Sequence, residues 1–185
     1  MSDLLAEVKL IRDEKLKLWV ARYLDSCVPP YFFTVPASSS GKYHPSYALG
    51  VGGLVRHTKA VVQIAEELLQ LEQYQDLNIN YHDEIITACI IHDTFKHGDI
   101  DAGHTVFDHP NVASDCFEGF MVLNRADLPI SQVNTICHLV RSHMGQWNTS
   151  PKSDVVLDKP ITREQQFVHM CDYLASRRNI TVRVE

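Results

Sequence analysis

The sequence predicts an all-α fold, a bundle of about six to eight helices. Three observations support this. Apolar residues recur at helical spacing along most of the chain, strand signals are few, and 185 residues suit one domain of roughly 100–200 residues.

Composition and charge exclude several classes of protein. With 45% apolar and 22% charged residues the composition is that of a globular protein, and no apolar run approaches the roughly 20 residues of a membrane span. Seventeen basic and 23 acidic side chains give a net charge of −6, which disfavours a long nucleic-acid duplex as a partner. We therefore expect neither a membrane nor a long duplex as a partner.

The N-terminal residues and the cysteines indicate in which cellular compartment the protein is found. The first ten residues mix acidic with apolar side chains and lack the uninterrupted apolar region of a secretory signal. The five cysteines show no Cys-x-x-Cys spacing, so reduced thiols are expected. Both observations predict a cytoplasmic protein.

Two amphipathic helices are expected in the first part of the chain. The first spans roughly 3–25, and Pro29 and the proline after it end it. A loop follows to about residue 50. The clearest helix covers 51–72, and His57 lies on its apolar stripe.

The next expected helix covers 82–96 and is apolar on much of its circumference. His92 and Asp93 should therefore point inward. Neighbouring residues on a helix diverge by about 100°, so these two side chains can reach different partners.

Three further helices complete the prediction. Pro110 fits the first position of a helix that runs to about residue 124, with His109 as its N-cap. A helix over about 131–144 turns His143 toward the core.

The last helix opens with Thr162 and Gln165 in the spacing of a capping box, and Asp172 lies at the edge of its apolar face.

Four imidazoles and two carboxylates from five of these helices thus lean toward one interior. They are His57, His92, Asp93, His109, His143 and Asp172. Burying unpaired His and Asp costs a few kcal/mol each, and a bound cation would satisfy all six. We infer a site for one or two divalent transition metals, namely Mn, Fe, Co, Ni or Zn, with Mg also open.

The order of these residues resembles the HD superfamily of metal-dependent phosphohydrolases, whose pattern is a helical His, a His-Asp pair and a distal Asp. The matching residues are His57, His92–Asp93 and Asp172. The strings GGLVRHTKAVVQIAEELL, IIHDTFKHG and VHMCDYLASR carry the resemblance, which covers roughly 43–180.

The resemblance implies an HD-type helical bundle as a single domain over 1–185, with the helix at 3–25 packed on it. Members with two metals add histidines between the pair and the distal Asp, and His109 and His143 look like those ligands. His104, which lies in a Gly-containing turn, is the alternative to His109.

Two segments are similar to particular branches of the superfamily. HLVRSHMGQWNTSPK is similar to the second His segment of HD-type 3′-to-5′ exoribonucleases, with Met144 in place of their second His. VPASSSGKYHPSYALG looks like a loop of small stand-alone HD proteins of phage and prophage origin. The His-His and Gly-Tyr-Pro motifs of cyclic-di-nucleotide phosphodiesterases are missing.

The implied chemistry is hydrolysis of a phosphate ester. A cation lowers the pKa of its bound water from about 15.7 to about 7, and the resulting hydroxide attacks phosphorus. Asp93 and Lys96 are the expected catalytic residues, because Asp93 can bridge two cations and Lys96 can neutralise phosphate charge. A solvated lysine at a helix end is the alternative for Lys96.

The expected substrate is a small-molecule nucleotide or a short single-stranded nucleic-acid end. Trp147 could stack on a base or merely cover the rim of the site, and Arg177 is a further candidate donor to phosphate. The residues expected to bind substrate are Lys42, His44, Arg56, Lys59, Arg141 and Trp147.

Two alternative functions stay open at this point. Some HD proteins with such ligands house a di-iron centre that activates oxygen to cleave carbon bonds. The other alternative is a non-catalytic nucleotide-binding module. The sequence also leaves open whether the chain forms a homo-oligomer.

Overall fold

The computed structural model describes residues 2–38, 41, 44–180 and 182–183. This part of the chain contains α-helices, short 3-10 helices and one isolated bridge, but no strand, which confirms the all-α prediction. The α-helices are α1 (Leu5–Val8), α2 (Glu14–Ser26), α3 (Gly53–Leu69), α4 (Gln75–Ile91), α5 (His109–Leu123), α6 (Ile130–Arg141) and α7 (Arg163–Ala175). The 3-10 helices are η1 (Ser2–Leu4), η2 (Pro30–Phe33), η3 (Ser46–Ala48) and η4 (Glu72–Tyr74).

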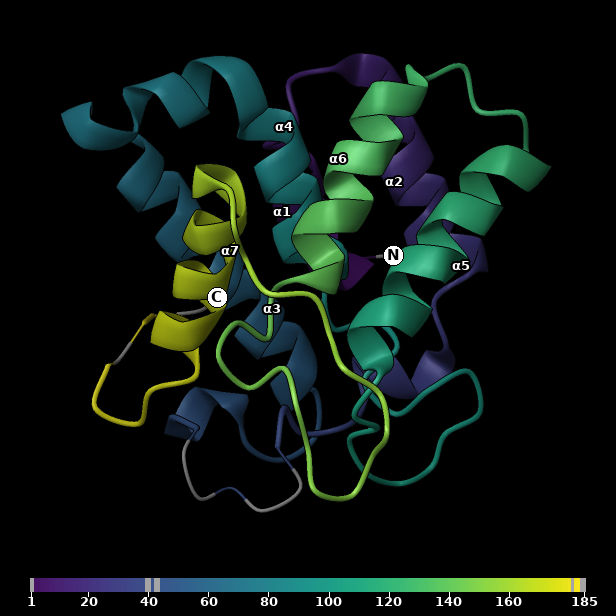
Figure 1. Cartoon of the computed structure of the whole chain (residues 1–185), viewed down its shortest axis with the longest axis vertical. Helices are drawn as coiled ribbons and strands as arrows, with labels where there is room; N and C mark the ends of the chain where they lie inside the picture. The colour runs from purple at the N-terminus through teal and green to yellow at the C-terminus, as the bar shows by residue number, and fades with distance from the viewer. Residues whose placement is uncertain (1, 39–40, 42–43, 181, 184–185) are drawn as a thin grey trace.

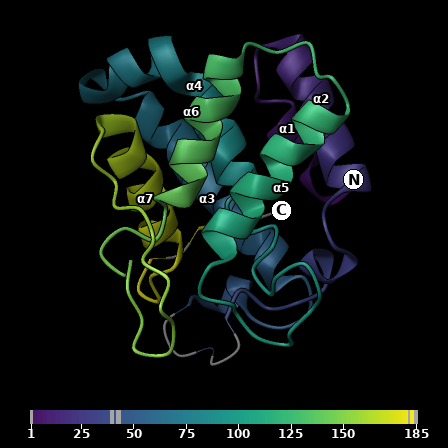
Figure 2. The ribbon, with the colours of Figure 1, turned by 45° about the vertical axis from the view of Figure 1, so that its right-hand side comes forward.

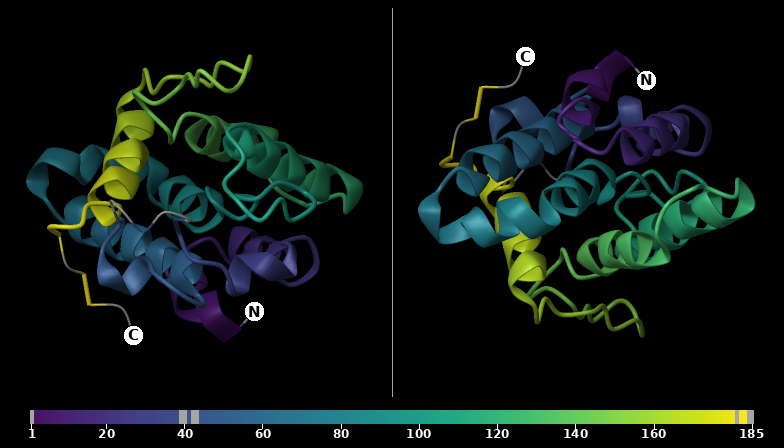
Figure 3. Two further views of the ribbon diagram at one scale, coloured as in Figure 1. Left: turned by 90° about the horizontal axis from the view of Figure 1, so that it is seen from below. Right: turned by 90° about the horizontal axis from the view of Figure 1, so that it is seen from above.

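α3 and α4 form the centre of the bundle (Figure 1). α7 packs against both of them, α6 packs against α4, and α5 covers α6, as a view turned by 45° also shows (Figure 2). One hydrophobic cluster draws side chains from all seven α-helices. Seen from below and above, the two ends of the described chain lie on the same side of the molecule (Figure 3).

The N-terminal segment differs from the prediction of one helix over 3–25. It forms α1 and α2, separated by a link at 9–13. In this link the main-chain N–H groups of Arg12 and Asp13 donate to the Asp83 carboxylate at 2.9 and 2.7 Å. Asp13 in turn accepts from the first N–H groups of α2 and caps that helix. The helix is therefore broken by a long-range contact with α4.

Several helix ends also differ from the sequence-based bounds. α4 ends at Ile91, so His92 is its C-cap and Asp93 lies in the following turn. His109 is the first residue of α5 rather than its N-cap, which is Asp108. α6 ends at Arg141, which leaves His143 just beyond it.

The predicted capping box of α7 is confirmed. Thr162 accepts a hydrogen bond from the Gln165 N–H at 3.4 Å, and the Gln165 side chain accepts from the Thr162 N–H at 3.0 Å. These bonds satisfy two of the unpaired donors at the start of the helix.

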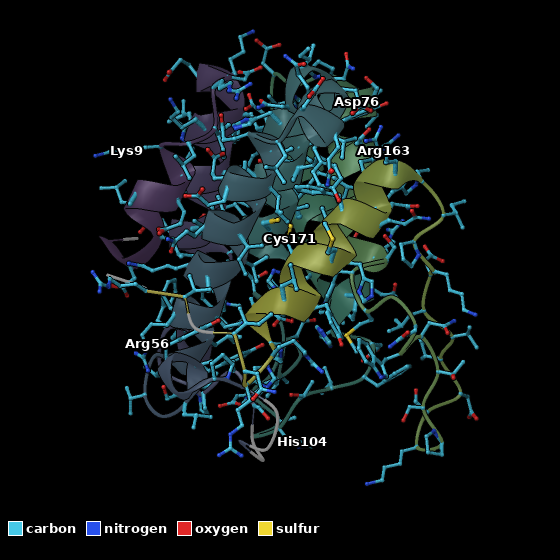
Figure 4. All side chains as sticks on the ribbon, turned by 90° about the vertical axis from the view of Figure 1, so that its left-hand side faces the viewer. Lys9, Arg56, Asp76, His104, Arg163 and Cys171 are labelled. Atoms are coloured by element: carbon cyan, nitrogen blue, oxygen red, sulfur yellow. The ribbon has the colours of Figure 1, made fainter. Side chains whose placement is uncertain are left out.

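The two ends of the bundle differ in character. The described parts of the long connections that follow η2, α4 and α6 gather at the lower end in Figure 1. Arg56 and His104 lie toward this end, whereas Asp76 and Arg163 meet at the opposite end (Figure 4), with Arg163 donating to Asp76 at 2.8 Å. Among the described residues, no helix combines the length and the apolar character that a membrane crossing requires.

Candidate metal centre

The six predicted metal ligands all lie at or near helix ends on the side of the bundle where the loops gather. His57 lies near the start of α3, His92 caps α4, and His109 opens α5. His143 follows α6, and Asp172 lies in the last turn of α7. Helices of different direction thus bring their ends to one place.

The six side chains form two groups, each with ligand atoms within 4.8 Å of one another. The first ligand group contains His57, His92 and Asp172, and the second ligand group contains Asp93, His109 and His143. His104, the alternative to His109, belongs to neither group and is exposed.

Asp93 faces both groups with different oxygen atoms. Its Oδ2 lies 3.7 Å from His57 Nε2 and 3.5 Å from His92 Nε2. Its Oδ1 lies 3.1 Å from His109 Nε2 and 3.7 Å from His143 Nε2. The carboxylate is therefore placed to bridge two cations.

Main-chain carbonyl oxygens orient three of the four histidines. In each case the ring Nδ1 donates to the carbonyl three residues earlier. The pairs are His92 with Cys89 at 2.8 Å, His109 with Val106 at 2.7 Å and His143 with Val140 at 2.7 Å. Because a carbonyl oxygen only accepts, the proton of each neutral ring lies on Nδ1 and a lone pair is left on Nε2.

These lone pairs face other acceptors. His109 Nε2 and His143 Nε2 lie 3.3 Å apart, and both point at Asp93 Oδ1. In the described part of the chain, His92 Nε2, Asp93 Oδ1 and both ring nitrogens of His57 are buried without a hydrogen-bond partner. Burial of such atoms is costly unless a cation lies between them. The donor set therefore fits divalent metal ions.

The charge states of Asp93 and His143 suit a metal. Burial alone would raise the pKa of Asp93, but neighbouring positive charge, above all that of Lys96, outweighs burial and holds this pKa well below its ordinary value. Burial lowers the pKa of His143 to about 3, so that ring is neutral near pH 7. Metal ligands must be ionised carboxylates and neutral imidazoles.

Lys96 and His44 lie beside the two ligand groups. Lys96 Nζ donates to Asp93 Oδ2 at 2.5 Å. The rings of His44 and His57 are 5.6 Å apart, and burial, followed by the charges of His57 and Lys96, lowers the pKa of His44 to about 4. Both residues are therefore within reach of a ligand at the centre.

Most of the other predicted substrate residues have protein partners. The Arg56 guanidinium donates to the carbonyl oxygens of residues 47, 49 and 51 at 2.6, 2.8 and 2.9 Å, which fastens this loop to α3. Arg141 pairs with Asp115 at 2.7 Å. Lys59 lines surface pockets on another side of α3, and Lys42 lies outside the described residues. Their roles in substrate binding stay predictions.

Trp147 stacks on Tyr173, with ring centroids 5.7 Å apart and an interplanar angle of 13°. Tyr173 is a site residue that the sequence did not single out, although its position next to Asp172 was available as a sign. Trp147 therefore contacts α7 at the edge of the metal centre.

Three other histidines make side-chain hydrogen bonds to neighbouring segments. His82 and His97 are both buried and hydrogen-bonded to carboxylates, His97 to Asp101 at 2.7 Å. His169 donates from Nδ1 to the carbonyl oxygen of His143 at 2.7 Å. Its spacing of three residues from Asp172 places it on the same face of α7 and could have indicated this.

Comparison with known proteins agrees with this geometry. The family model described as HD domain matches residues 54–177, a range that contains all six ligands and Lys96. Searches among curated proteins and among solved structures found no match. The match covers more than half of the sequence and includes both ligand groups, so the chain belongs to the HD domain family.

Proposed function

We propose that the protein is a metal-dependent phosphohydrolase. Its substrate would be a nucleotide or a short single-stranded nucleic-acid end with a phosphomonoester or phosphodiester bond. Membership of the HD domain family and the two ligand groups support this proposal. The observation that carries it is the position of Asp93, whose two oxygens face different histidine pairs.

The two ligand groups would hold two cations with Asp93 shared between them. Imidazole and carboxylate ligands suit Mn, Fe, Co, Ni or Zn. When bound, these cations would supply positive charge for phosphoryl oxygens and would acidify a coordinated water molecule.

Lys96 adds a further positive charge at the first ligand group. Its Nζ contacts Asp93 Oδ2, the oxygen that faces His57 and His92. Its side chain is only 12% exposed, so its charge acts where little water screens it. Lys96 would hold Asp93 in its bridging orientation and attract a phosphate group.

The test compares wild-type protein with Asp93→Asn. Both proteins, loaded with Mn, Co, Ni or Mg, are assayed on mononucleotides, cyclic nucleotides and short oligonucleotides, and their metal content is measured by mass spectrometry. Asp93→Asn should lower hydrolysis at least about 100-fold, because even residues that only orient a metal ligand are worth roughly 10- to 100-fold. Its metal content should also fall.

Asp25→Asn is the matched control, since Asp25 is an exposed carboxylate on α2, and it should behave as wild type. Full hydrolysis by Asp93→Asn or by chelator-treated protein would contradict the proposal. Iron-dependent consumption of oxygen without phosphate release would favour a di-iron oxygenase instead. Protein that takes up no transition metal would favour the non-catalytic binding module.

A further inference from the structure

Trp147, Tyr173 and Arg177 form an aromatic platform beside the metal centre. The indole and phenol rings are nearly parallel, and the Arg177 guanidinium carbon lies 4.4 Å from the Tyr173 centroid and 5.8 Å from that of Trp147. Arg177 also donates to the Tyr173 carbonyl at 3.2 Å and to the Ser176 hydroxyl at 2.8 Å. These bonds fix the cation against the two rings.

The platform borders a pocket of about 310 Å³ lined by Gln146, His169, Met170 and Tyr173. This volume lies at the lower end of the roughly 300–1,000 Å³ of small-molecule sites. Trp147 remains 43% exposed although one of its faces contacts Tyr173. A flat, polar-edged ligand can therefore reach the indole from solvent.

One residue that lines the pocket, His169, also contacts a segment that carries a metal ligand. The His169 ring lies 6.0 Å from the Trp147 ring and donates to the carbonyl oxygen of His143, a member of the second ligand group. Tyr173 directly follows Asp172, a member of the first ligand group. A ligand on the platform would thus lie beside residues that are bonded to, or adjacent in sequence to, members of both groups.

We propose that this aromatic platform binds the base of a nucleotide by stacking while the phosphate lies at the metal centre. The inference rests on the proposed function and names the part of the substrate that is recognised. Every nucleobase offers a π face, so stacking tolerates different bases, and the nearby cation strengthens it. A sugar phosphate without a base would lose this contact.

The first test uses the second tryptophan of the chain as an internal control. The chain contains two tryptophans, and Trp19 packs on Phe120 with Arg22 over its ring, a similar environment without a metal centre. In the Trp19→Phe protein, Trp147 is the sole indole. With chelator present, adenosine monophosphate should quench its fluorescence saturably, and ribose 5-phosphate should not.

The second test measures the affinity for adenosine monophosphate by calorimetry. Trp147→Ala should raise the Kd about 5- to 150-fold, the range that base stacking gives on alanine substitution. Trp147→Phe should restore most of the affinity, and Trp19→Phe should leave the Kd unchanged. Thermal melting of each variant shows whether it folds. The fluorescence test keeps Trp147 in place and therefore does not depend on the folding of the Trp147 variants.

Two results would overturn the inference: ribose 5-phosphate binding as tightly as adenosine monophosphate, or an unchanged Kd in folded Trp147→Ala. Neither readout requires turnover. Base binding without hydrolysis would therefore refute the proposed function and keep the platform. Hydrolysis without base-dependent binding would refute the aromatic platform as a base-binding site and keep the proposed function.

Discussion

At the scale of single residues, Gly145 and His169 show how closely the turn after α6 is fitted to α7. Gly145 has a φ of +60°, and a Cβ built on it would lie 2.2 Å from atoms of the His169 ring. That ring cannot move away without giving up its hydrogen bond to the His143 carbonyl. The position therefore requires glycine for two reasons, the left-handed backbone and the close approach.

We expect Gly145→Ala to destabilise the protein by clearly more than the roughly 1–2 kcal/mol of a left-handed non-glycine residue. Gly103→Ala is the matched control, because Gly103 has a φ of +72° and a Cβ added there would meet nothing within 4 Å. The free energies of unfolding of both variants are measured by urea denaturation. Equal losses in the two variants would show that His169 does not constrain the turn.

At the scale of elements, the site depends on where helices begin and end. The last turns of α4 and α6 present carbonyl oxygens beyond the regular helical pattern, and those of Cys89 and Val140 accept from the rings of His92 and His143. The ends of these helices thus orient the metal ligands directly. α7 is different, because Asp172 lies within the helix and depends on the position of the whole element.

The capping box should contribute measurably to the stability of α7. Thr162→Ala removes the acceptor for the Gln165 N–H and should lower the free energy of unfolding by about 0.5–2 kcal/mol. Gln166→Ala, an exposed change in the same helical turn, serves as control and should cost little. Chemical denaturation of the two variants gives the comparison. If Thr162→Ala is no worse than Gln166→Ala, the box contributes nothing.

At the scale of the whole molecule, a partly buried network away from the metal centre joins three segments. His82 Nε2 contacts Glu66 of α3 at 2.8 Å, and its Nδ1 contacts Asp83 of α4 at 2.8 Å. Asp83 also accepts from the main chain of the link between α1 and α2. The N-terminal segment is thus tied to the central helices through one carboxylate.

This network should make stability depend on pH in a defined direction. Burial alone would lower the pKa of His82, but hydrogen bonds with Asp83 and Glu66 outweigh it and raise this pKa above its ordinary value of 6.5. The stabilisation from His82 is therefore fully present below pH 6.5 and is lost as the pH rises through the raised value. Asp83 behaves in the opposite way, because the hydrogen bonds from His82 and from the main chain outweigh burial and lower its pKa.

The stabilisation from Asp83 is present above its ordinary pKa of 3.8 and is lost as the pH falls through the lowered value. The two contributions overlap between about pH 4 and pH 6.5. The difference in unfolding free energy between wild type and His82→Gln, measured by urea denaturation, should be largest there and shrink above. His138→Gln, at an exposed histidine on α6, is the control. A difference independent of pH would contradict the assignment.

The helical class, the approximate position of most helices and the pattern of the HD domain family can be read from the amino-acid sequence alone. These features are local: apolar spacing, caps and short motifs are written in consecutive residues. For the same reason the sequence could indicate six ionisable side chains on inward faces, including His57 and Asp172.

How these parts meet follows from the packing of the helices in three dimensions. It divided the six side chains into two groups around Asp93, broke the N-terminal helix at its contact with Asp83, and gave Arg56 main-chain partners in the segment before α3. It also brought Tyr173 under Trp147. Such contacts join residues far apart in the chain, and their geometry follows from how helices pack together, which the periodicity of a single helix does not encode.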